Sequence, residues 1–437
     1  MNRKISLGTG ISFALILVAI SISMTAIVLS HRFSNSVNNL ERRAAMYDKI
    51  EAVDSTVRQE FYGNIDQDKL MDEVAKGYLK GIGDPYAVYH TAEEYNEIMK
   101  QSDGKAAGIG ISVEMDVSGY IRVKDVYPDS PAESSGIMKN HLIVEIDDLS
   151  VTKENYNQAV EAIKGSAGTT LTLVVRDEDT SEEKTIDLTR RVVVAPTVFT
   201  KQIGNVGYIR ISGFNATTYD QFRKAARQME SDEMNALIFD LRNNVGGTEE
   251  SLIKILDYIL PEGDIMSVTY KSGETEVLAV SDEDCIELPM VVLVNERTAS
   301  AAELFAQALK DYNKAVLVGT TTFGKGSMQK THQLRDGSAV TYTVAKYNPP
   351  KSGNFEGVGV KPDFEVTLTE DQKLNFNTLD ETNDPQILKA LEYLNAELNK
   401  LGFGGVSVDI SMTEDTTEDT EAEESTEDGD EEEKEEE

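Results

Sequence analysis

One serine and one lysine in the second half of the chain are placed where they could perform acyl-transfer chemistry. Ser300 lies in a polar turn between an apolar run, 291–294, and a segment, 301–312, whose apolar residues recur with helical spacing. Lys325 lies between two glycines, which let the backbone turn sharply and present the side chain. A serine nucleophile needs a base, and a lysine can act as one when burial lowers its pKa from about 10.4 toward neutrality.

Each of these residues also has an ordinary structural interpretation. Ser300 precedes a helix, where a serine often caps the unpaired N–H groups of the first turn. The same N–H groups could instead stabilise an oxyanion beside a nucleophile. Lys325 could be a solvated turn residue, and His332 is the histidine of this part of the chain that could replace it as the base.

Paired glycines form a third feature with chemical potential. Gly246 and Gly247 follow a strand-like run and precede a helical pattern. Without side chains, their backbone can approach a substrate closely and offer a second oxyanion donor. A phosphate-binding loop is disfavoured, because the GxxxxGK[ST] pattern is absent and no basic residue directly follows the glycines.

The hydrophobic pattern divides the chain into segments that would position these residues. Apolar residues at three- and four-residue spacing predict helices, whereas short alternating runs between turn residues predict a small β-rich module. Farther along, strand and helix patterns alternate, which favours an α/β core. The predicted segments are a start with a transmembrane signal anchor at 1–35, a helical region at 36–103, the β-rich module at 104–192, the α/β core at 193–368, a helical region at 369–412 and a tail at 413–437.

The N-terminal segment has the length and charge pattern of a membrane anchor. No charged residue occurs from Ile5 to Ser30, which exceeds the roughly 20 residues needed to cross a bilayer as a helix. Arg3 and Lys4 precede it, which favours a cytoplasmic N-terminus. The sequence therefore predicts a single-pass anchor with the body outside the cytoplasm. A cleaved signal peptide is the alternative, and it leads to the same compartment.

The charge of the chain disfavours some classes of function and predicts a disordered tail. The net charge is −35, and residues 413–437 contain 16 acidic residues and one lysine, which predicts a disordered, solvated tail. The acidic body disfavours nucleic-acid binding, which needs clustered basic residues. Cys285 is the single cysteine, so neither an intrachain disulfide nor a cysteine metal cluster is expected. No cofactor or metal is expected, and an exported protein without disulfides fits a bacterial cell envelope.

Taken together, the motifs resemble those of the carboxy-terminal processing proteases, also called tail-specific proteases. The resemblance extends over about 45–368, and the β-rich module resembles a PDZ domain. Val245 replaces a proline of the family pattern, and Thr298 and Ala302 replace its outer serines. The matching stretches are "DLRNNVGG" at 240–247, "TASAAE" at 298–303, "FGKGSMQ" at 323–329 and, in the PDZ-like module, "GIGIS" at 108–112.

The resemblance implies a multidomain fold and a Ser/Lys active site. The expected architecture is a transmembrane helix, a helical segment, a PDZ β-module and an α/β protease core of the crotonase or Clp-protease type. Ser300 is the implied nucleophile, Lys325 the implied base and Gln329 the residue that supports the lysine. The backbone N–H groups of Gly246 and Ala301 are the implied oxyanion hole.

The PDZ-like module implies how substrates are chosen. The loop of Gly108, Ile109, Gly110 and Ile111 would bind the C-terminus of a substrate, and Arg176 would contact the catalytic site and help to activate it. Protein or peptide substrates are the expected partners, and the helical region suggests a homodimer. The alternatives are a non-catalytic PDZ scaffold that binds C-terminal peptides and an enzyme that handles acyl-CoA.

Overall fold

The computed structural model describes residues 40–178 and 180–406, together with Leu17, Ser21 and Met24. The chain divides into two compact units, Met1–Ala75 and Lys76–Glu437. The predicted anchor lies outside the described residues apart from those three positions, and so does the predicted acidic tail. In the described part of the chain, no helix is both long and apolar enough to cross a membrane.

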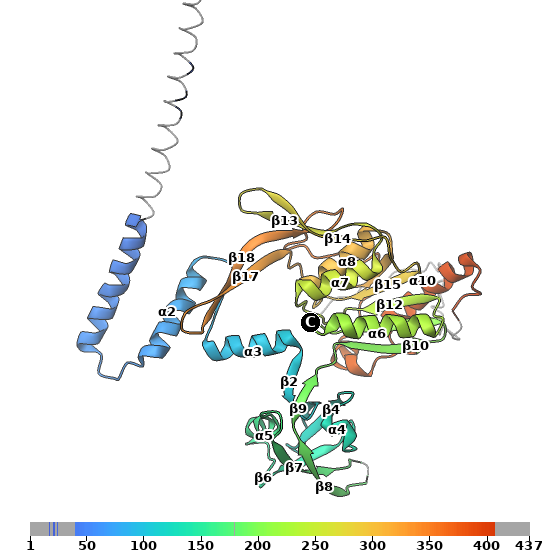
Figure 1. Ribbon diagram of the computed structural model, residues 1–437, viewed down its shortest axis with the longest axis horizontal. Helices are drawn as coiled ribbons and strands as arrows, with labels where there is room; N and C mark the ends of the chain where they lie inside the picture. Colours follow the sequence, from blue (N-terminus) through green and yellow to red (C-terminus); the bar gives the residue numbers. More distant parts are fainter. Residues whose placement is uncertain (1–16, 18–20, 22–23, 25–39, 179, 407–437) are drawn as a thin grey trace, which may run out of the picture. The chain divides into compact units, whose positions relative to one another are not determined.

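The region predicted to be helical contains three helices in the described residues and one short strand (Figure 1). A helix covers 40–60, and α2 (Gln67–Gly81) and α3 (Ala92–Asp103) follow. Thr91 caps α3, because its side chain accepts the Glu94 N–H. Between the two later helices the chain forms β1 (Val88–His90), which the sequence analysis did not predict.

The β-rich module is confirmed as a small sheet with two helices. Its strand order is β3-β4-β5-β7-β8, all antiparallel, with β6 paired to β5. A separate pair, β2 and β9, lies at the two ends of the module in the sequence. The elements are β2 (Lys105–Gly108), β3 (Ile111–Met115), β4 (Ile121–Val126), α4 (Pro131–Ser134), β5 (Leu142–Ile146), β6 (Leu149–Ser150), α5 (Tyr156–Ile163), β7 (Thr170–Arg176), β8 (Glu183–Thr189) and β9 (Arg191–Val194).

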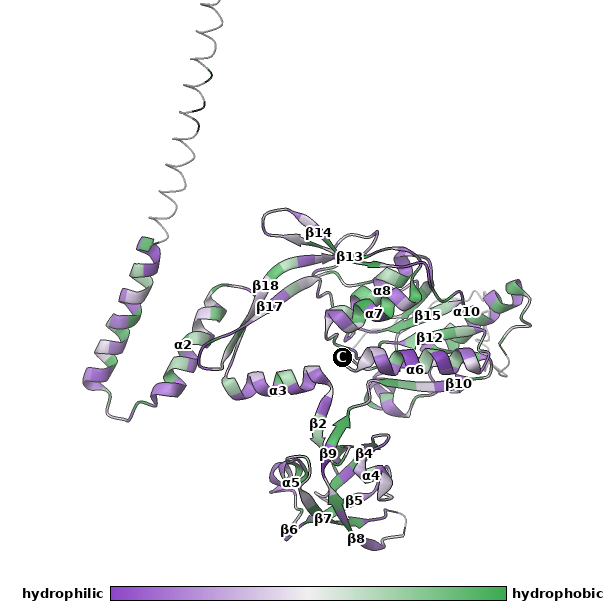
Figure 2. Cartoon of the chain, in the orientation of Figure 1, coloured by the Kyte–Doolittle hydropathy of each residue, from purple (hydrophilic) through white to green (hydrophobic). Residues whose placement is uncertain are grey.

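The predicted α/β core is built on a mostly parallel sheet. Its order is β10-β11-β12-β15-β16-β19, and only the β10–β11 pair is antiparallel. Every residue of β12 and β15 is buried, and both are mostly hydrophobic, as expected of strands covered on both faces (Figure 2). The strands are β10 (Val198–Ile203), β11 (Val206–Ile211), β12 (Ala236–Asp240), β15 (Met290–Val294), β16 (Ala315–Gly319) and β19 (Phe364–Glu365).

Alternate residues of these strands enter two different cores, because side chains point to opposite faces of a strand. Phe239 of β12 packs with residues of helices α6 (Thr218–Ser231), α7 (Glu249–Ile259) and α8 (Ala301–Asp311). Its neighbour Ile238 packs instead with residues of α10 (Pro385–Leu401). The sheet is therefore covered by helices on both sides. Two short helical segments, α9 (Glu370–Leu374) and a 3₁₀ turn (Phe376–Thr378), precede α10.

A second sheet was not predicted by the alternating strand and helix pattern. It has the antiparallel order β1-β18-β13-β14, with β17 also paired to β18. Its strands are β13 (Gly263–Tyr270), β14 (Thr275–Ser281), β17 (Ser327–Gln333) and β18 (Ala339–Asn348). The sheet matters for the site because β17 begins two residues after Lys325.

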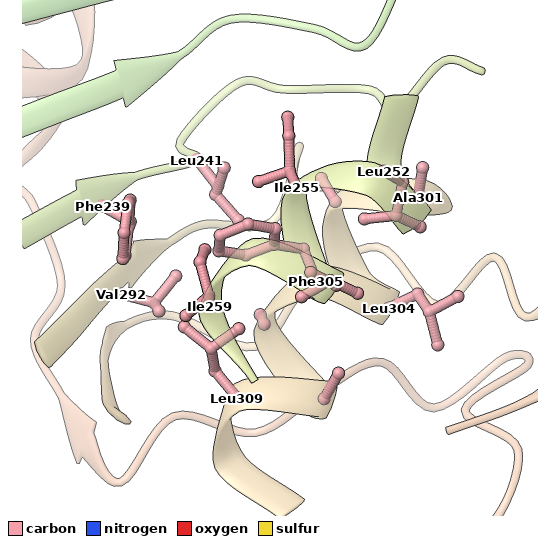
Figure 3. Packing of buried hydrophobic residues seen from close by; sticks show 14 of the residues in the cluster. Phe239, Leu241, Leu252, Ile255, Ile259, Val292, Ala301, Leu304, Phe305 and Leu309 are labelled. Carbon is pink, nitrogen blue, oxygen red and sulfur yellow. The ribbon is translucent and has the colours of Figure 1, made fainter. Parts of the chain in front are cut away.

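Helix α8 is fixed firmly in the core. Phe305 lies edge-on to Phe239 with ring centroids 5.5 Å apart, and it also contacts Phe214. Figure 3 shows Phe305 and Ala301 of α8 among the buried side chains of α7 and the sheet. Because Ala301 is held in this cluster, the residue just before it has little freedom to move.

Candidate active site

The turn that contains Ser300 is bonded to the turn that contains the paired glycines. β15 ends at Val294, and the Thr298 hydroxyl group donates to the Leu241 carbonyl oxygen at 2.9 Å. The Ala299 N–H donates to the Asn244 carbonyl oxygen, also at 2.9 Å. The carboxyl ends of the parallel strands β12 and β15 thus bring these two predicted features together.

Ser300 has an unusual backbone conformation for a helix cap. Its φ is +57° and its ψ is −120°, whereas an ordinary N-cap residue has extended backbone at negative φ. Positive φ is unfavourable for a residue with a side chain, and such strain costs about 1–3 kcal/mol. A sharp strand-to-helix turn of this kind exposes the serine side chain of a nucleophile. The conformation therefore favours the catalytic interpretation of Ser300 over the simple cap.

A buried glutamate joins the serine turn to the lysine turn. Glu303 is fully buried, and its Oε2 atom accepts the backbone N–H groups of both Ser300 and Lys325, each at 2.8 Å. Its Oε1 atom accepts the Thr322 hydroxyl group at 2.5 Å and the Gly324 N–H at 2.6 Å. The sequence analysis assigned no role to Glu303, although its position three residues after a helix-capping serine is a recognisable capping-box signal.

The glycines beside Lys325 are required by close backbone packing. Gly324 has a φ of +93°, and a Cβ atom there would lie 2.9 Å from the Gly359 nitrogen. A Cβ atom on Gly326 would lie 2.8 Å from the Glu356 nitrogen. The Gly357 N–H also donates to the Gly324 carbonyl oxygen at 2.8 Å. The lysine turn therefore packs directly against the turn that contains Glu356.

The environment of Lys325 is suited to a base. Its Nζ atom lies 5.1 Å from the centroid of the Tyr86 ring. Burial lowers the pKa of Lys325, while the charges of Glu356 and Glu303 partly oppose this effect. The Tyr86 hydroxyl group donates to Glu356 Oε1 at 2.8 Å, and burial is the main cause that raises the pKa of Tyr86 to about 12. No motif in the sequence pointed to Tyr86.

The two predicted oxyanion donors, the N–H groups of Gly246 and Ala301, differ in whether they already donate a hydrogen bond. A Cβ atom on Gly246 would lie 3.0 Å from Ser300 Cβ and 3.1 Å from the Ala301 nitrogen, so only glycine fits beside the serine turn. The Ala301 N–H has no hydrogen-bond partner among the described residues. The Gly246 N–H donates to Asn244 Oδ1 at 2.8 Å and is therefore occupied in this structure.

A buried charge network lies next to the turn that contains Gly246 and Gly247, here called the glycine loop. The Arg242 guanidinium group donates to the carboxylate groups of Asp240 and Asp384, with a shortest distance of 2.7 Å to each. Asp384 is also the N-cap of α10 and accepts the Gln386 N–H. The Tyr208 hydroxyl group completes the set by donating to Asp240. The network joins the end of β12 to the start of α10.

Comparison with known proteins identifies the family. Residues 205–366 match peptidase family S41, and residues 97–176 match the PDZ domain. A "Probable CtpA-like serine protease" of Staphylococcus epidermidis is 32% identical over 364 residues, which cover 83% of this chain and 73% of the relative. The chain belongs to peptidase family S41. It is a serine peptidase of the C-terminal processing type with a PDZ domain, so the predicted resemblance and activity are confirmed.

A second curated relative agrees with this membership. A protein of the same name from Staphylococcus aureus is 31% identical over 363 residues, which cover 82% of this chain and 72% of the relative. Among solved structures, the photosystem II D1 C-terminal processing protease is 26% identical, with a TM-score of 0.44. The similar region covers 72% of this S41 peptidase and 86% of the solved chain.

Gln329 of the S41 peptidase is hydrogen-bonded to residues of β17 and β18. Its Nε2 atom donates to the carbonyl and hydroxyl oxygens of Ser327 and to the Thr343 hydroxyl oxygen. No hydrogen bond between Gln329 and Lys325 occurs in the described residues. The supporting role of Gln329 remains a prediction. His332, the alternative base, is exposed on β17 and stacks on Tyr342.

Arg176 is bound within the PDZ domain of the S41 peptidase. Its guanidinium group pairs with Glu183 on the neighbouring strand at 2.6 Å and lies over the Tyr120 ring at 5.0 Å. These contacts account for the position of its side chain inside the domain. Its predicted role in activation remains a prediction.

The predicted carboxylate-binding loop of the PDZ domain connects β2 to β3. Ile109 is buried in the domain core, and Gly110 has a φ of +80°. The carbonyl oxygens of both residues accept backbone N–H groups, from Ala132 and Tyr127 respectively. The following strand, β3, pairs with β4 alone among the described strands, so its other edge is open.

Proposed function

We propose that this S41 peptidase is a membrane-anchored, extracytoplasmic endopeptidase that recognises substrate C-termini and cleaves with a Ser300/Lys325 dyad. The observation that carries the dyad is the shared carboxylate oxygen of Glu303, which fixes the two backbones to each other. The strained turn at Ser300 and the lowered pKa of Lys325 support the same assignment.

The proposed reaction follows from these two groups. Neutral Lys325 takes the proton of the Ser300 hydroxyl group while Oγ attacks the carbonyl carbon of the substrate peptide bond. The carbonyl π electrons move to the oxygen and give a tetrahedral oxyanion. Collapse of this species breaks the C–N bond, and Lys325 returns its proton to the leaving amine. Water, deprotonated by Lys325, then hydrolyses the acyl-enzyme and restores Ser300.

The oxyanion hole is proposed to use the backbone N–H groups of Ala301 and Gly246. The Ala301 N–H lies at the start of α8, where the helix dipole favours negative charge. The Gly246 N–H becomes available when the Asn244 side chain gives up its hydrogen bond to it. Asn244 would keep its second anchor, the bond from Nδ2 to the Ile211 carbonyl oxygen at 2.8 Å.

The PDZ domain is proposed to hold the C-terminal tail of the substrate. The open edge of β3 can accept the tail as an added strand, and the loop of 108–111 supplies backbone N–H groups for its carboxylate. Ile111 and Val113 on β3 and Val160 on α5 are partly buried hydrophobic residues that suit an apolar tail. Binding should therefore require a free carboxylate and should fail with an amidated peptide.

The proposed location rests on the N-terminal sequence. An uncharged stretch of membrane-spanning length follows Arg3 and Lys4, and this pattern supports a body outside the cytoplasm. Treatment of intact cells with an added protease should degrade the body of the protein. Protection of the body in intact cells, with digestion after lysis, would contradict this location.

Replacement of the serine tests the proposed chemistry. We expect Ser300→Ala to abolish cleavage of an unfolded reporter protein while the melting temperature stays at or above that of the parent. Ser272→Ala, in the turn between β13 and β14, is the matched control and should cleave normally. Cleavage by purified Ser300→Ala at the parent rate would overturn the nucleophile assignment.

A further inference from the structure

Two carboxylate groups face Lys325, and their hydrogen bonding differs. Glu303 reaches it from α8, and Glu356 from the turn that packs against the lysine turn. Both oxygens of Glu303 are used, because four donors from the serine and lysine turns occupy them. Glu303 therefore has little capacity left to accept the lysine amine as well.

Glu356 has one oxygen in use and one open. Its Oε1 atom accepts the Tyr86 hydroxyl group at 2.8 Å. Its Oε2 atom is buried and has no hydrogen-bond partner among the described residues. A buried acceptor without a donor is costly and rare in folded proteins, so its presence calls for a functional explanation.

Tyr86 links Lys325 to the carboxylate group of Glu356. The Asp84 carboxylate fixes this segment by accepting the Tyr86 N–H at 3.0 Å and the Thr343 N–H of β18 at 2.7 Å. The Tyr86 ring lies under the Lys325 amine at 5.1 Å, and its hydroxyl group binds Glu356. One tyrosine thus contacts both the base and the carboxylate.

The turn of Glu356 is itself fixed in place. Its backbone N–H donates to Asn354 Oδ1 at 2.9 Å, and Asn354 Nδ2 donates to the Gly326 carbonyl oxygen at 2.6 Å. Asn354 therefore connects the residue after the lysine to the glutamate. The position of the carboxylate is therefore fixed by backbone hydrogen bonds as well as by Tyr86.

We propose that Glu356, oriented by the Tyr86 hydroxyl group, is a positioning residue that accepts the Lys325 ammonium group through its open Oε2 atom. This inference rests on the proposed role of Lys325 as the base. In the resting enzyme the contact holds the protonated lysine. The lysine acts as a base only after it loses this proton and turns to Ser300.

The charge of Glu356 then sets the pH range of the protease. The groups that face Lys325 are Glu303 on α8, Glu356 on its turn and Tyr86 before β1. A nearby negative charge favours the protonated lysine, so Glu356 keeps the amine charged up to a higher pH. Its removal should make neutral lysine available at lower pH.

The test is the pH dependence of kcat/KM for the full-length enzyme, with a fluorescein-labelled unfolded protein as the substrate. Glu356→Gln keeps an acceptor for Tyr86 and loses the charge. We expect its acidic limb to move down by about one pH unit or more. Glu356→Asp keeps the charge and should stay close to the parent, and Glu365→Gln, at the exposed residue of β19, is the matched control.

The outcomes separate this inference from the proposed function. An unmoved limb in Glu356→Gln would overturn the inference, whether or not the rate at the plateau falls, because a purely structural residue would change only the rate. Lys325→Ala in the same assay examines the proposed function. If it cleaves normally, the lysine is not the base. If it is inactive while Glu356→Gln shows no shift, only the positioning role fails.

Discussion

The backbone N–H groups of Ser300 and Lys325 donate to the same oxygen atom, Oε2 of Glu303, at 2.8 Å each. The proposed nucleophile and base are therefore held together through their main chains. The glutamate belongs to α8, which is fixed in the core through Phe305. A local change in this helix should therefore affect both residues at once.

Loss of the Glu303 charge should disable the site. A glutamine side chain has one acceptor oxygen, and its NH₂ group is a donor. It therefore cannot accept all four of the hydrogen bonds that Glu303 accepts, and the two turns should separate. We expect Glu303→Gln to lower kcat/KM by about 10²-fold, since small displacements of reacting groups are costly. The free energy of unfolding should fall by about 1–3 kcal/mol.

Reporter cleavage and urea unfolding measure these two effects. Glu296→Gln is the control, because Glu296 is an exposed residue of the same β15–α8 turn and accepts the Thr320 hydroxyl group at 3.0 Å. Equal activity of Glu303→Gln and the parent would show that the hydrogen bonds from the two turns to Glu303 are not needed for cleavage.

Gly246 should tolerate no side chain. A Cβ atom there would lie 3.0 Å from Ser300 Cβ, so Gly246→Ala should displace the serine turn and reduce cleavage to background. Gly273→Ala separates this contact from backbone strain. Gly273 also has a positive φ, +86°, but has open space around it, so its alanine variant should lose about 1 kcal/mol of stability and keep its activity. Comparable activity in both variants would argue against close packing at the loop.

Arg242 should be needed for stability as well as for the shape of the glycine loop. Its removal leaves the carboxylate groups of Asp240 and Asp384 buried without their cation, which typically costs about 3–5 kcal/mol. We expect Arg242→Met to lower the free energy of unfolding by this amount in urea titrations. Arg223→Met, which breaks an exposed pair with Asp220 on α6, should cost less than about 1 kcal/mol. A change in the free energy of unfolding below about 1 kcal/mol in Arg242→Met would show that the buried carboxylate groups do not need the arginine.

The activity of the enzyme should rise with pH, because only neutral Lys325 can accept a proton. Burial lowers the pKa of Lys325, so the midpoint of the rise in kcat/KM should fall below about 10.4, the ordinary value for lysine. The midpoint should move down rather than up, because a lower pKa means more neutral amine at a given pH. A pH–rate profile of reporter cleavage gives the midpoint. A midpoint at or above the ordinary lysine value would contradict a buried base.

The sequence predicted the parts of the site that are local in the chain. Ser300, Lys325 and Gly246 could be found because each stands in a short motif between a strand and a helix or between glycines. The alternation of strands and helices correctly predicted the α/β core, whose central strands, β12 and β15, are buried runs of mostly hydrophobic residues. The open or occupied state of the Gly246 N–H could not be predicted, because it depends on one side-chain torsion of Asn244.

The parts that the sequence did not predict depend on contacts between distant segments. Tyr86 and Glu356 are 270 positions apart, and no periodic pattern relates them. The second sheet was missed because β1 has three residues and pairs with β18 far along the chain. Its β17–β18 hairpin carried a usable signal, since the "RDGS" turn at 335–338 separates two runs that favour strands.

The claim that neutral Lys325 is the base for Ser300 is tested most directly by cleavage of an unfolded reporter by Lys325→Ala and Lys325→Arg. Both variants should be folded, as judged by their melting temperatures, and both should fail to cleave, because arginine does not lose its proton near neutral pH. Lys330→Ala, which removes an exposed lysine on β17, should cleave at the parent rate. Cleavage by Lys325→Arg at a rate near that of the parent would contradict the account.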